Sequence, residues 1–488
     1  MLKRTLLIGV VLAVSARSYA QGICSSSSNK LVCVLPELYS PSGGVNLPNA
    51  AHKAHFDTDF EQNAAALNAA VGTELTSLRL ASPASGLVFT FDKTAGIVRP
   101  TTESFGPILG ERAETIGRHR FFVAATYQYF PFSSLDGINL KHVPAVYKHA
   151  DTLNHDGTHR QPTDPPSPGD PGVELEYITT TNRIDLKVHQ VTIYATYGLS
   201  SRIDVSVAIP VLNVRMGATS NATIVRSADP ISQPIPASAY QNDPNSLLGR
   251  LYASTGPDAD CAKTQPPSCS GYFHYFNASD PAGSLNATFA NARTATGLGD
   301  VVFRVKGTVV KRERAAVAIG ADLRVPTGDE NNFLGSGAVG FKPFLAASYR
   351  ARVSPHVNFG YEVNGTSVLA GNATTGEKRG LPEQFFYSAG IDTKVTRKLT
   401  AAADLLGQRL FDAPRVAQGA FVDVQGNSHP NIAQTTSTRG SFNINDLAVG
   451  AKYELAAKLL FTGNLQFKLD DGGLRAKVTP LVGLSYTF

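Results

Sequence analysis

The sequence lacks tryptophan, contains only two methionines and four cysteines, and has no long apolar run after its first residues. A membrane-spanning helix needs about 20 predominantly apolar residues, and no stretch here reaches even about 18. The chain is therefore not expected to cross a membrane with helices. Any aromatic girdle at a membrane surface would have to be built from its 17 tyrosines and 25 phenylalanines.

A large excess of charge of one sign is also missing. Lys and Arg together number 44, against 39 Asp and Glu. Removing Lys3, Arg4 and Arg17 with the leader described below leaves 41 basic residues against 39 acidic ones, a formal charge of +2. So small a charge does not argue for nucleic acid as a partner, and we expect none.

Short catalytic motifs are absent as well. The sequence contains no G-x-S-x-G nucleophile elbow, no H-E-x-x-H zinc motif and no phosphate-binding loop. We therefore predict no enzyme, no catalytic residue and no cofactor. The enzymatic alternative is a Ser–His pair in a barrel wall, as in membrane phospholipases, which a motif search does not detect.

The first 20 residues have the pattern of a secretory signal peptide. Met1 to Arg4 carry two positive charges, about ten apolar residues follow over 5–14, and Ser18 and Ala20 form a small-x-small cleavage site. A lipid anchor would need a cysteine directly after cleavage, whereas Cys24 comes three residues later. We predict that residues 1–20 are removed and that the mature chain is exported.

The four cysteines form two local pairs. Cys24 lies near Cys33, and Cys261 lies near Cys269. Exported chains meet an oxidising compartment in which such pairs usually close, so two disulfides are expected. Zinc binding is the alternative, although neither pair has the short Cys-x-x-Cys spacing of structural zinc sites.

From residue 119 onward the dominant pattern is alternation of apolar with polar or small residues, which is typical of strands with two different faces. At the end of the chain, Val482, Leu484, Tyr486 and Phe488 share one face, and small or polar residues share the other. A terminal Phe after such alternation resembles the signal that hands outer-membrane barrels to their insertion machinery. One face suits lipid and the other water.

Twelve such segments can be found, an even number, as single-chain bacterial barrels require. At about 3.3 Å per residue and a tilt near 45°, ten residues rise about 23 Å, close to the thickness of the apolar band. The segments lie near 119–130, 181–198, 202–216, 299–310, 314–325, 339–351, 356–369, 384–395, 399–410, 441–455, 458–469 and 474–488.

The connections between these segments alternate in length. Outer-membrane barrels have long extracellular loops and short periplasmic turns. Long connections are predicted at 131–180, 217–298, 326–338, 370–383 and 411–440, with a shorter one at 470–473. The sequence therefore predicts an all-β, antiparallel transmembrane β-barrel of about twelve strands in the bacterial outer membrane, with outer-membrane lipid and the barrel-insertion machinery as partners.

Residues 21–118 lack the strand alternation. Apolar residues at helical spacing predict a helix within 59–80, and the sequence around 87–98 predicts a hairpin. We therefore divide the chain into a signal peptide (1–20), a small α+β plug or periplasmic segment (21–118) and the barrel (119–488). The helix is expected to pack against its own hairpin, with insertion into the barrel lumen as the alternative.

The face opposite the apolar one is rich in charge of both signs. Such residues either form salt bridges that hold the barrel's shape or line a wet, selective path. The residues predicted to line the lumen are Asp185, Lys187, Arg304, Lys306, Asp322, Arg324, Glu362, Asp392, Asp404 and Lys452.

Four histidines lie close together in the first long connection. His142, His149, His155 and His159 are accompanied there by Asp151 and Asp156. Imidazole and carboxylate groups are suitable ligands for zinc or copper, so these histidines are candidate metal ligands. Because their spacing matches no set motif, they can equally be polar residues of a solvated loop.

Several stretches resemble the MetA-pathway phenol-degradation family of outer-membrane proteins. The resemblance implies a transport-type barrel, distantly similar to channels for hydrophobic compounds. The stretches are 105–108 with 111–115, 197–200 with 204–210, 296–300, 326–329, 358–361 and 404–407, which together span roughly 105–410.

The function predicted from these observations is a channel or transporter for small solutes, aromatic or hydrophobic ones among them. Twelve strands enclose a lumen between the filled eight-stranded barrels and the wet 16-stranded porins, so a narrow passage partly filled by residues 21–118 is expected. The alternative is a surface-exposed structural or ligand-binding barrel that acts through its long outer loops.

Overall fold

The structure of the chain is a computed structural model. It describes residues 24, 29–39, 47, 56–58, 67–75, 89–92, 97–100, 104–149, 177–225, 276–277, 284–372, 375–422 and 428–488. The predicted signal peptide and most of the two longest connections lie outside these ranges.

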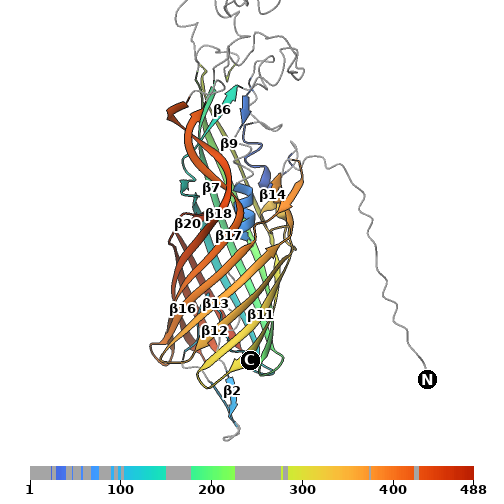
Figure 1. Ribbon diagram of the computed structural model, residues 1–488, viewed down its shortest axis with the longest axis vertical. Coiled ribbons are helices and arrows are strands. Elements are labelled where there is room, and N and C mark those ends of the chain that lie inside the picture. Colours follow the sequence, from blue (N-terminus) through green and yellow to red (C-terminus); the bar gives the residue numbers. More distant parts are fainter. Residues whose placement is uncertain are drawn as a thin grey trace, which may run out of the picture.

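Twelve antiparallel strands close into a barrel, because the last strand pairs with the first through neighbours such as Leu484 and Ala125 (Figure 1). This confirms the predicted all-β barrel and its strand number. In order around the barrel, the strands are β4 (Phe121–Leu135), β7 (Tyr177–Gly198), β8 (Ile203–Val225), β10 (Val301–Lys311), β11 (Ala315–Val325), β12 (Gly340–Tyr349), β13 (Val353–Asn364), β16 (Gln384–Lys394), β17 (Leu399–Val422), β18 (Ser428–Ala456), β19 (Leu459–Lys468) and β21 (Val478–Thr487).

Smaller elements complete the described chain, and residues 67–75 are helical. No described helix is long and apolar enough to span a membrane. The remaining elements are η1 (Leu31–Cys33), β1 (Phe56–Thr58), β2 (Phe89–Asp92), β3 (Ile97–Pro100), β5 (Ile138–Asn139), β6 (Val143–His149), β9 (Asn286–Leu298), η3 (Glu330–Asn332), β14 (Thr366–Asn372), β15 (Glu377–Gly380) and β20 (Leu474–Ala476).

The outer face of the barrel is apolar. Along the strands, large apolar side chains that are 36–56% exposed alternate with polar residues turned inward. Buried side chains on the inner face include Asp392, Asp404 and Lys452. An apolar exterior around a polar interior is the arrangement that lipid requires of a barrel. The chain is a transmembrane β-barrel of the bacterial outer membrane, and its exterior contacts lipid.

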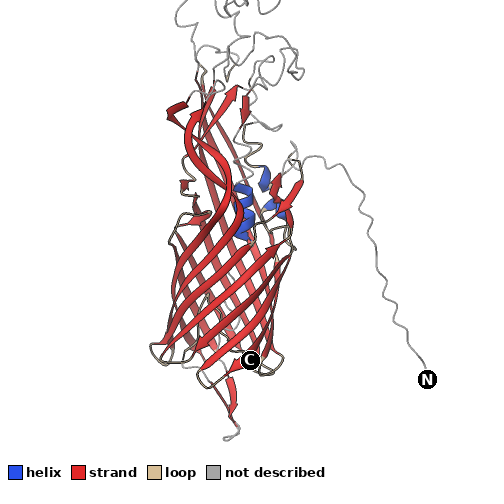
Figure 2. Ribbon diagram, viewed as in Figure 1, coloured by secondary structure: helices blue, strands red, loops and turns tan. Residues whose placement is uncertain are grey.

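The short connections gather at the end of the barrel where the C-terminus lies, which identifies the periplasmic end (Figure 1). Beyond the other end, several strands continue well past the barrel (Figure 2). The predicted loops 217–298 and 411–440 were therefore too long. β8 runs on to Val225 and β9 begins at Asn286, whereas β17 and β18 occupy most of 411–440.

Strand β7 shows where the membrane ends. Its odd-numbered residues face outward along its whole length, but they change from polar, as in Lys187 and His189, to apolar, as in Val191 and Ile193. The even-numbered residues change in the opposite sense, from apolar over 184–188 to polar over 190–192. The outward face therefore turns from water-compatible to lipid-compatible between residues 189 and 191.

Strand β8 changes at the same height. Val191 pairs with the outward Val211, whereas His189 pairs with Asn213. Residues 177–189 of β7, 213–225 of β8 and 286–296 of β9 thus lie beyond the apolar belt. We call this part the outer extension. It has an apolar interior, like a soluble β-protein, and a polar exterior.

The outer extension is filled by part of the N-terminal segment. Residues 31–35 and 38–39 are buried in the same apolar cluster as side chains of β7 and β8, including Leu186 and Met216. The Tyr39 hydroxyl lies 2.8 Å from the Ser220 hydroxyl, and Arg293 of β9 forms an ion pair with Glu37. The expected disulfide between Cys24 and Cys33 is present at the start of this segment.

The predicted helix and hairpin are both found, but they do not pack together. Residues 67–75 are helical, and the β2–β3 hairpin matches the one predicted around 87–98. The helix packs against the β14–β15 hairpin, because a Cβ at Gly72 would lie 2.9 Å from Leu369 Cβ. The β2–β3 hairpin lies at the periplasmic end (Figure 1). The prediction that the helix packs against its own hairpin was wrong.

Candidate functional site

Residues 104–117 lie inside the barrel, and we call them the luminal segment. Its backbone is held by inward side chains of several strands. The amide of Phe105 donates to Thr400 Oγ1 at 2.9 Å, the amide of Glu111 to Asn358 Oδ1 at 2.8 Å, and the amide of Ile116 to Asp204 Oδ2 at 3.0 Å. A segment without strand pairing is thus fixed by polar groups that the alternation of the strands turns inward.

A buried ion pair anchors the start of the luminal segment. Arg112 lies 2.7 Å from Asp392, and both side chains are almost completely buried. The Ser104 hydroxyl also donates to Asp392. Lys452 donates to the carbonyl oxygens of Phe105 and Pro107. Charges buried in this way are tolerable only when hydrogen bonds replace the lost water.

A second set of contacts holds the middle of the segment. Glu111 accepts from Arg304 at 2.8 Å and from Lys306 at 2.6 Å. Lys306 also donates to the carbonyl oxygens of Arg112 and Glu114, each at 2.9 Å. One carboxylate from the segment thereby joins two cations of β10.

His356 lies beneath the luminal segment between two carboxylates. Its Nε2 is 2.6 Å from Asp404 Oδ1, and its Nδ1 is 3.7 Å from Asp392 Oδ1. A Cβ at Gly110 would lie only 2.5 Å from His356 Nε2. Glycine is therefore required at position 110, because the backbone passes directly over the imidazole.

The connection 326–338 does not extend outward as a plain loop but folds toward the barrel axis. Asp300 accepts from the amides of Gly328, at 3.1 Å, and Ser336, at 2.8 Å. Phe333 and Leu334 are buried in the same apolar cluster as residues 31–39. Arg324 supports this fold by donating to the carbonyl oxygen of Ala338 at 2.8 Å.

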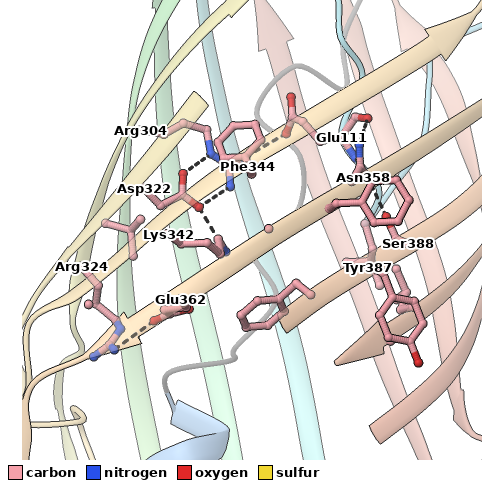
Figure 3. Close-up of a pocket in the computed structure, with 18 residues that line it drawn as sticks. Glu111, Arg304, Asp322, Arg324, Lys342, Phe344, Asn358, Glu362, Tyr387 and Ser388 are labelled. Atoms are coloured by element: carbon pink, nitrogen blue, oxygen red, sulfur yellow. Dashed lines mark hydrogen bonds and ion pairs between the residues drawn. The ribbon is translucent and has the colours of Figure 1, made fainter. Parts of the chain in front are cut away.

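A cavity of about 150 Å³ lies beside the luminal segment (Figure 3). Two aromatic rings border it, and each carries a cation: the Arg304 guanidinium is 5.0 Å from the Phe344 ring centre, and Lys342 Nζ is 4.9 Å from that of Phe386. The lining residues are Leu109, Glu111, Val302, Arg304, Asp322, Arg324, Gly340, Lys342, Phe344, Asn358, Phe359, Gly360, Glu362, Phe386, Tyr387, Ser388, Leu406 and Gly407.

The charges around this cavity are paired with one another. Asp322 binds Arg304 at 2.6 Å and Lys342 at 3.1 Å, and Arg324 lies 3.0 Å from Glu362. With Glu111, three anions face three cations, so the lining has no net charge. Such a site suits an uncharged solute, and the aromatic rings offer it an apolar surface.

An apolar groove of about 730 Å³ lies on the lipid-facing side of the same wall. The groove and the cavity share Phe344, Phe359 and Gly360 as lining residues. The β12–β13 ladder is also interrupted here, because no residue pairs are formed between Phe341 and Phe344. Pro343 lies in the interruption and has no amide hydrogen to donate. The hydrogen-bond ladder of the barrel wall is therefore incomplete at this point.

The structure turns eight of the ten predicted lumen residues inward: Arg304, Lys306, Asp322, Arg324, Glu362, Asp392, Asp404 and Lys452. The prediction for Asp185 and Lys187 was wrong. They form an exposed ion pair on the outward face of the outer extension. The alternation of β7 is regular, but above the belt the polar face is the outer one, so a polar side chain no longer indicates the lumen.

Sequence reasoning did not single out the uncharged residues of the cavity. Phe344, Phe386 and Ser388 fall in predicted strands, on the same face as lumen charges such as Lys342. The alternation could have assigned them to the lumen, but their aromatic or small character gave no reason to select them. Glu111 lies in one of the family-like stretches and carried no predicted role.

The histidine cluster stays a prediction. His142 is exposed and His149 belongs to β6, whereas His155 and His159 lie outside the described residues, as do Cys261 and Cys269. Among the described residues, the one group with metal-ligand geometry contains Cys24 and Cys33, whose sulfurs are joined to each other.

The family resemblance is confirmed over part of the chain. Residues 272–473 match the model of the family described as "Putative MetA-pathway of phenol degradation". The stretches near 105–115 and 197–210 lie outside this range. No curated protein matches the chain.

Several solved structures are similar in part. The COG4313 outer membrane channel from Pseudomonas putida F1 is 11% identical, with a TM-score of 0.40, covering 77% of this chain and 98% of its own. A Pseudomonas aeruginosa FadL homologue is 10% identical, with a TM-score of 0.30 and coverages of 76% and 90%. The Ralstonia pickettii toluene transporter TbuX is 10% identical, with a TM-score of 0.24 and coverages of 76% and 89%.

Proposed function

We propose that this protein is an outer-membrane channel for small uncharged solutes, aromatic or hydrophobic ones among them, and that these solutes bind in the luminal cavity. The observation that carries the proposal is a cavity of about 150 Å³ that combines two phenylalanine rings with a charge-balanced lining. An apolar cavity of about that volume accommodates one benzene ring in a protein interior.

The polar groups at the cavity suit a solute with a single hydroxyl. Ser388 donates to Asn358 Oδ1 at 2.7 Å, and both residues line the cavity. A hydroxyl on the solute can exchange hydrogen bonds with them, while its ring contacts Phe344 and Phe386. A charged solute would meet a repelling group for each attracting one, because the lining has equal numbers of anions and cations.

The surroundings of the cavity offer two ways out. Toward the periplasm, the luminal segment contributes Leu109 and Glu111 to the lining, so passage requires this segment to shift. Toward the lipid, the cavity and the apolar groove have Phe344, Phe359 and Gly360 as common lining residues. Entry into the groove and the lipid beyond it lowers the free energy of a hydrophobic solute, because its apolar surface is removed from water.

In this proposal, the eight inward charges hold the luminal segment and set the lining of the cavity, and no catalytic step is assigned to the protein. Residues 21–118 and 119–488 remain the proposed units of the mature chain. We also propose that β21 and the exposed terminal Phe488 are read by the barrel-insertion machinery, since the strand presents one apolar face up to its last residue.

The test is the uptake of radiolabelled benzyl alcohol by intact cells that carry the protein in their outer membrane. Ser388→Trp fills the cavity with a bulky ring and is expected to reduce the saturable uptake about tenfold, to near that of cells without the protein. Ala389→Trp is the matched control, because the neighbouring residue faces lipid and is exposed.

Equal uptake with wild type and Ser388→Trp, with both proteins folded as judged by heat-dependent gel mobility, would contradict the proposal. A loss with Ala389→Trp as large as with Ser388→Trp would also contradict it, since the effect would then not arise from the cavity.

A further inference from the structure

A group of cations lies on the outward face of the outer extension, immediately beyond the apolar belt. Lys187 of β7 pairs directly with Arg215 of β8, and both side chains point away from the barrel. Arg183 lies on the same face, four residues farther along β7. We call these three residues the cationic site.

The chain itself supplies little negative charge to this site. Lys187 forms an ion pair with Asp185 at 2.9 Å, and Arg215 donates through Nε to Asn213 Oδ1 at 3.2 Å. Among the described residues, no ion pair is formed by Arg183 or Arg215. Three cations therefore face one carboxylate. Like charges placed directly opposite each other on neighbouring strands are destabilising unless an anion joins them.

The neighbouring strands do not compensate this charge either. In the described part of the chain, Arg215 is flanked on β9 by Thr294, and Lys187 is flanked on β4 by Pro131. Both positions are uncharged, so the site keeps its net positive charge across four adjacent strands.

The height of the site relative to the membrane is fixed by the residues beneath it. His189 bonds through Nδ1 to the Tyr127 hydroxyl at 2.8 Å, and its ring stacks on Tyr129 at 4.7 Å. Aromatic residues of this kind mark the membrane surface. Lys187 lies about three residues beyond the boundary between residues 189 and 191, which is about 10 Å along the strand and about 7 Å along the membrane normal at a tilt near 45°.

That height is the zone of lipid head groups, which extends about 5–8 Å beyond the hydrocarbon on each side. Long basic side chains reach readily toward this zone. Guanidinium groups match the geometry of phosphate oxygens, and an ammonium group adds a point charge. Arg183 lies about 13 Å farther along the strand than Lys187, about 9 Å farther from the membrane at a tilt near 45°, so it stands above the other two cations and faces the outer part of the head group.

We propose that Lys187, Arg215 and Arg183 form a binding site for the phosphate groups of an outer-leaflet glycolipid with two phosphates. The glycolipid supplies the anions that the like-charged pair lacks, while its acyl chains lie against Val191 and Val211. The site faces away from the lumen, so this inference does not depend on the solute or on the channel function.

The test is binding of a bisphosphorylated lipid A to the full-length protein in detergent, followed by native mass spectrometry. The double variant Lys187→Gln/Arg215→Gln is expected to bind about tenfold more weakly, because hydrogen bonds to charged groups are lost. Arg439→Gln is the control, since Arg439 is also exposed outside the belt but is already paired with Asp412 at 3.0 Å.

Comparison of probes identifies the ligand. The proposal expects weaker binding of dephosphorylated lipid A and of phosphatidylglycerol by the wild type, and no competition from millimolar inorganic phosphate. Unchanged affinity in the double variant would overturn it. So would equal binding of phosphatidylglycerol, which would indicate a general anionic surface, or displacement by inorganic phosphate, which would indicate a free-anion site. Heat-dependent gel mobility verifies that each variant is folded.

Discussion

At the scale of single residues, the interior is organised by charges that have no access to bulk water. Arg112 and Asp392 pair within the lumen, and His356 lies between Asp392 and Asp404. Such pairs add little net stability, since desolvation offsets their attraction, but removing one partner leaves a buried charge behind. Their main effect here is to hold the luminal segment in one place.

Arg112→Ala should therefore release the luminal segment. The variant leaves Asp392 without its guanidinium partner, and losses of about 3–5 kcal/mol are typical when a buried pair is broken. Hydrogen exchange of the amides of residues 104–117, followed by mass spectrometry, should become more than about a hundredfold faster.

Adding Asp392→Asn to Arg112→Ala should restore part of the protection, because the uncompensated charge is removed. Equal exchange in the wild type and the single variant would show that the pair does not anchor the segment.

Asp329 gives the N-terminal segment a dependence on pH. Burial raises the pKa of Asp329, but the hydrogen bond and charge of Lys30, at 2.9 Å, outweigh it, so the pKa lies below its usual value. Because the pKa of Asp329 is lower in the folded state than the value of about 3.9 in the unfolded state, its ionised carboxylate stabilises the folded contact above about pH 3.9. This contribution is lost as the pH falls through the lower pKa of the folded state.

Proteolysis of residues 29–39 should accordingly become faster as pH falls from 5 toward 3, measured with an acid-stable protease. In Asp329→Asn, this part of the pH dependence should disappear, because the carboxylate no longer titrates. A variant with the same pH profile as the wild type would assign the effect to another group.

At the scale of elements, the strands within the apolar belt could be predicted from alternation, whereas most of the strand length beyond it could not. In the belt, the contrast between lipid and lumen makes the pattern strong. In β9, alanine and asparagine occupy both faces, so the 13-residue strand resembled a polar loop. Asp185 and Lys187 were assigned to the lumen for a related reason. The two-residue alternation of β7 was predicted correctly, but beyond the belt its polar face is the outward one.

The candidate site was predictable to a similar degree. Alternation turned charges such as Arg304 and Asp322 inward, but it does not show which of them meet. That depends on the stagger between strands, which the sequence does not reveal. The cavity also needs Leu109 and Glu111 from a segment without periodicity, so its assembly could not be derived from strand patterns alone.

The reversal on β7 can be tested by placing the same residue on either side of the boundary. Ile193→Arg puts a charge within the belt, between its surface and its midplane, and should destabilise the folded protein by about 1–2 kcal/mol. Thr181→Arg puts it on the same face of the outer extension and should change stability by less than about 0.5 kcal/mol.

The measurement is urea unfolding of both variants in lipid vesicles, compared with the wild type. Similar losses for the two variants would mean that the membrane boundary does not lie between residues 189 and 191.

At the scale of the whole molecule, the barrel consists of two parts with opposite polarity, one above the other. The belt is a lipid-facing barrel with a polar interior, whereas the outer extension is built like a soluble β-protein with an apolar core. The N-terminal segment packs inside both parts, because residues 31–39 fill the core of the outer extension and residues 104–117 occupy the lumen of the belt. The cavity lies beside the luminal segment, where the β12–β13 ladder is interrupted.

The central claim is that this cavity receives a one-ring solute, and the most direct measurement is the anomalous scattering of bromine in crystals of the full-length protein soaked with 4-bromobenzyl alcohol. We predict a bromine peak inside the barrel between the rings of Phe344 and Phe386, which is absent in Ser388→Trp. Peaks confined to the outer surface, or an identical peak in Ser388→Trp, would contradict the account.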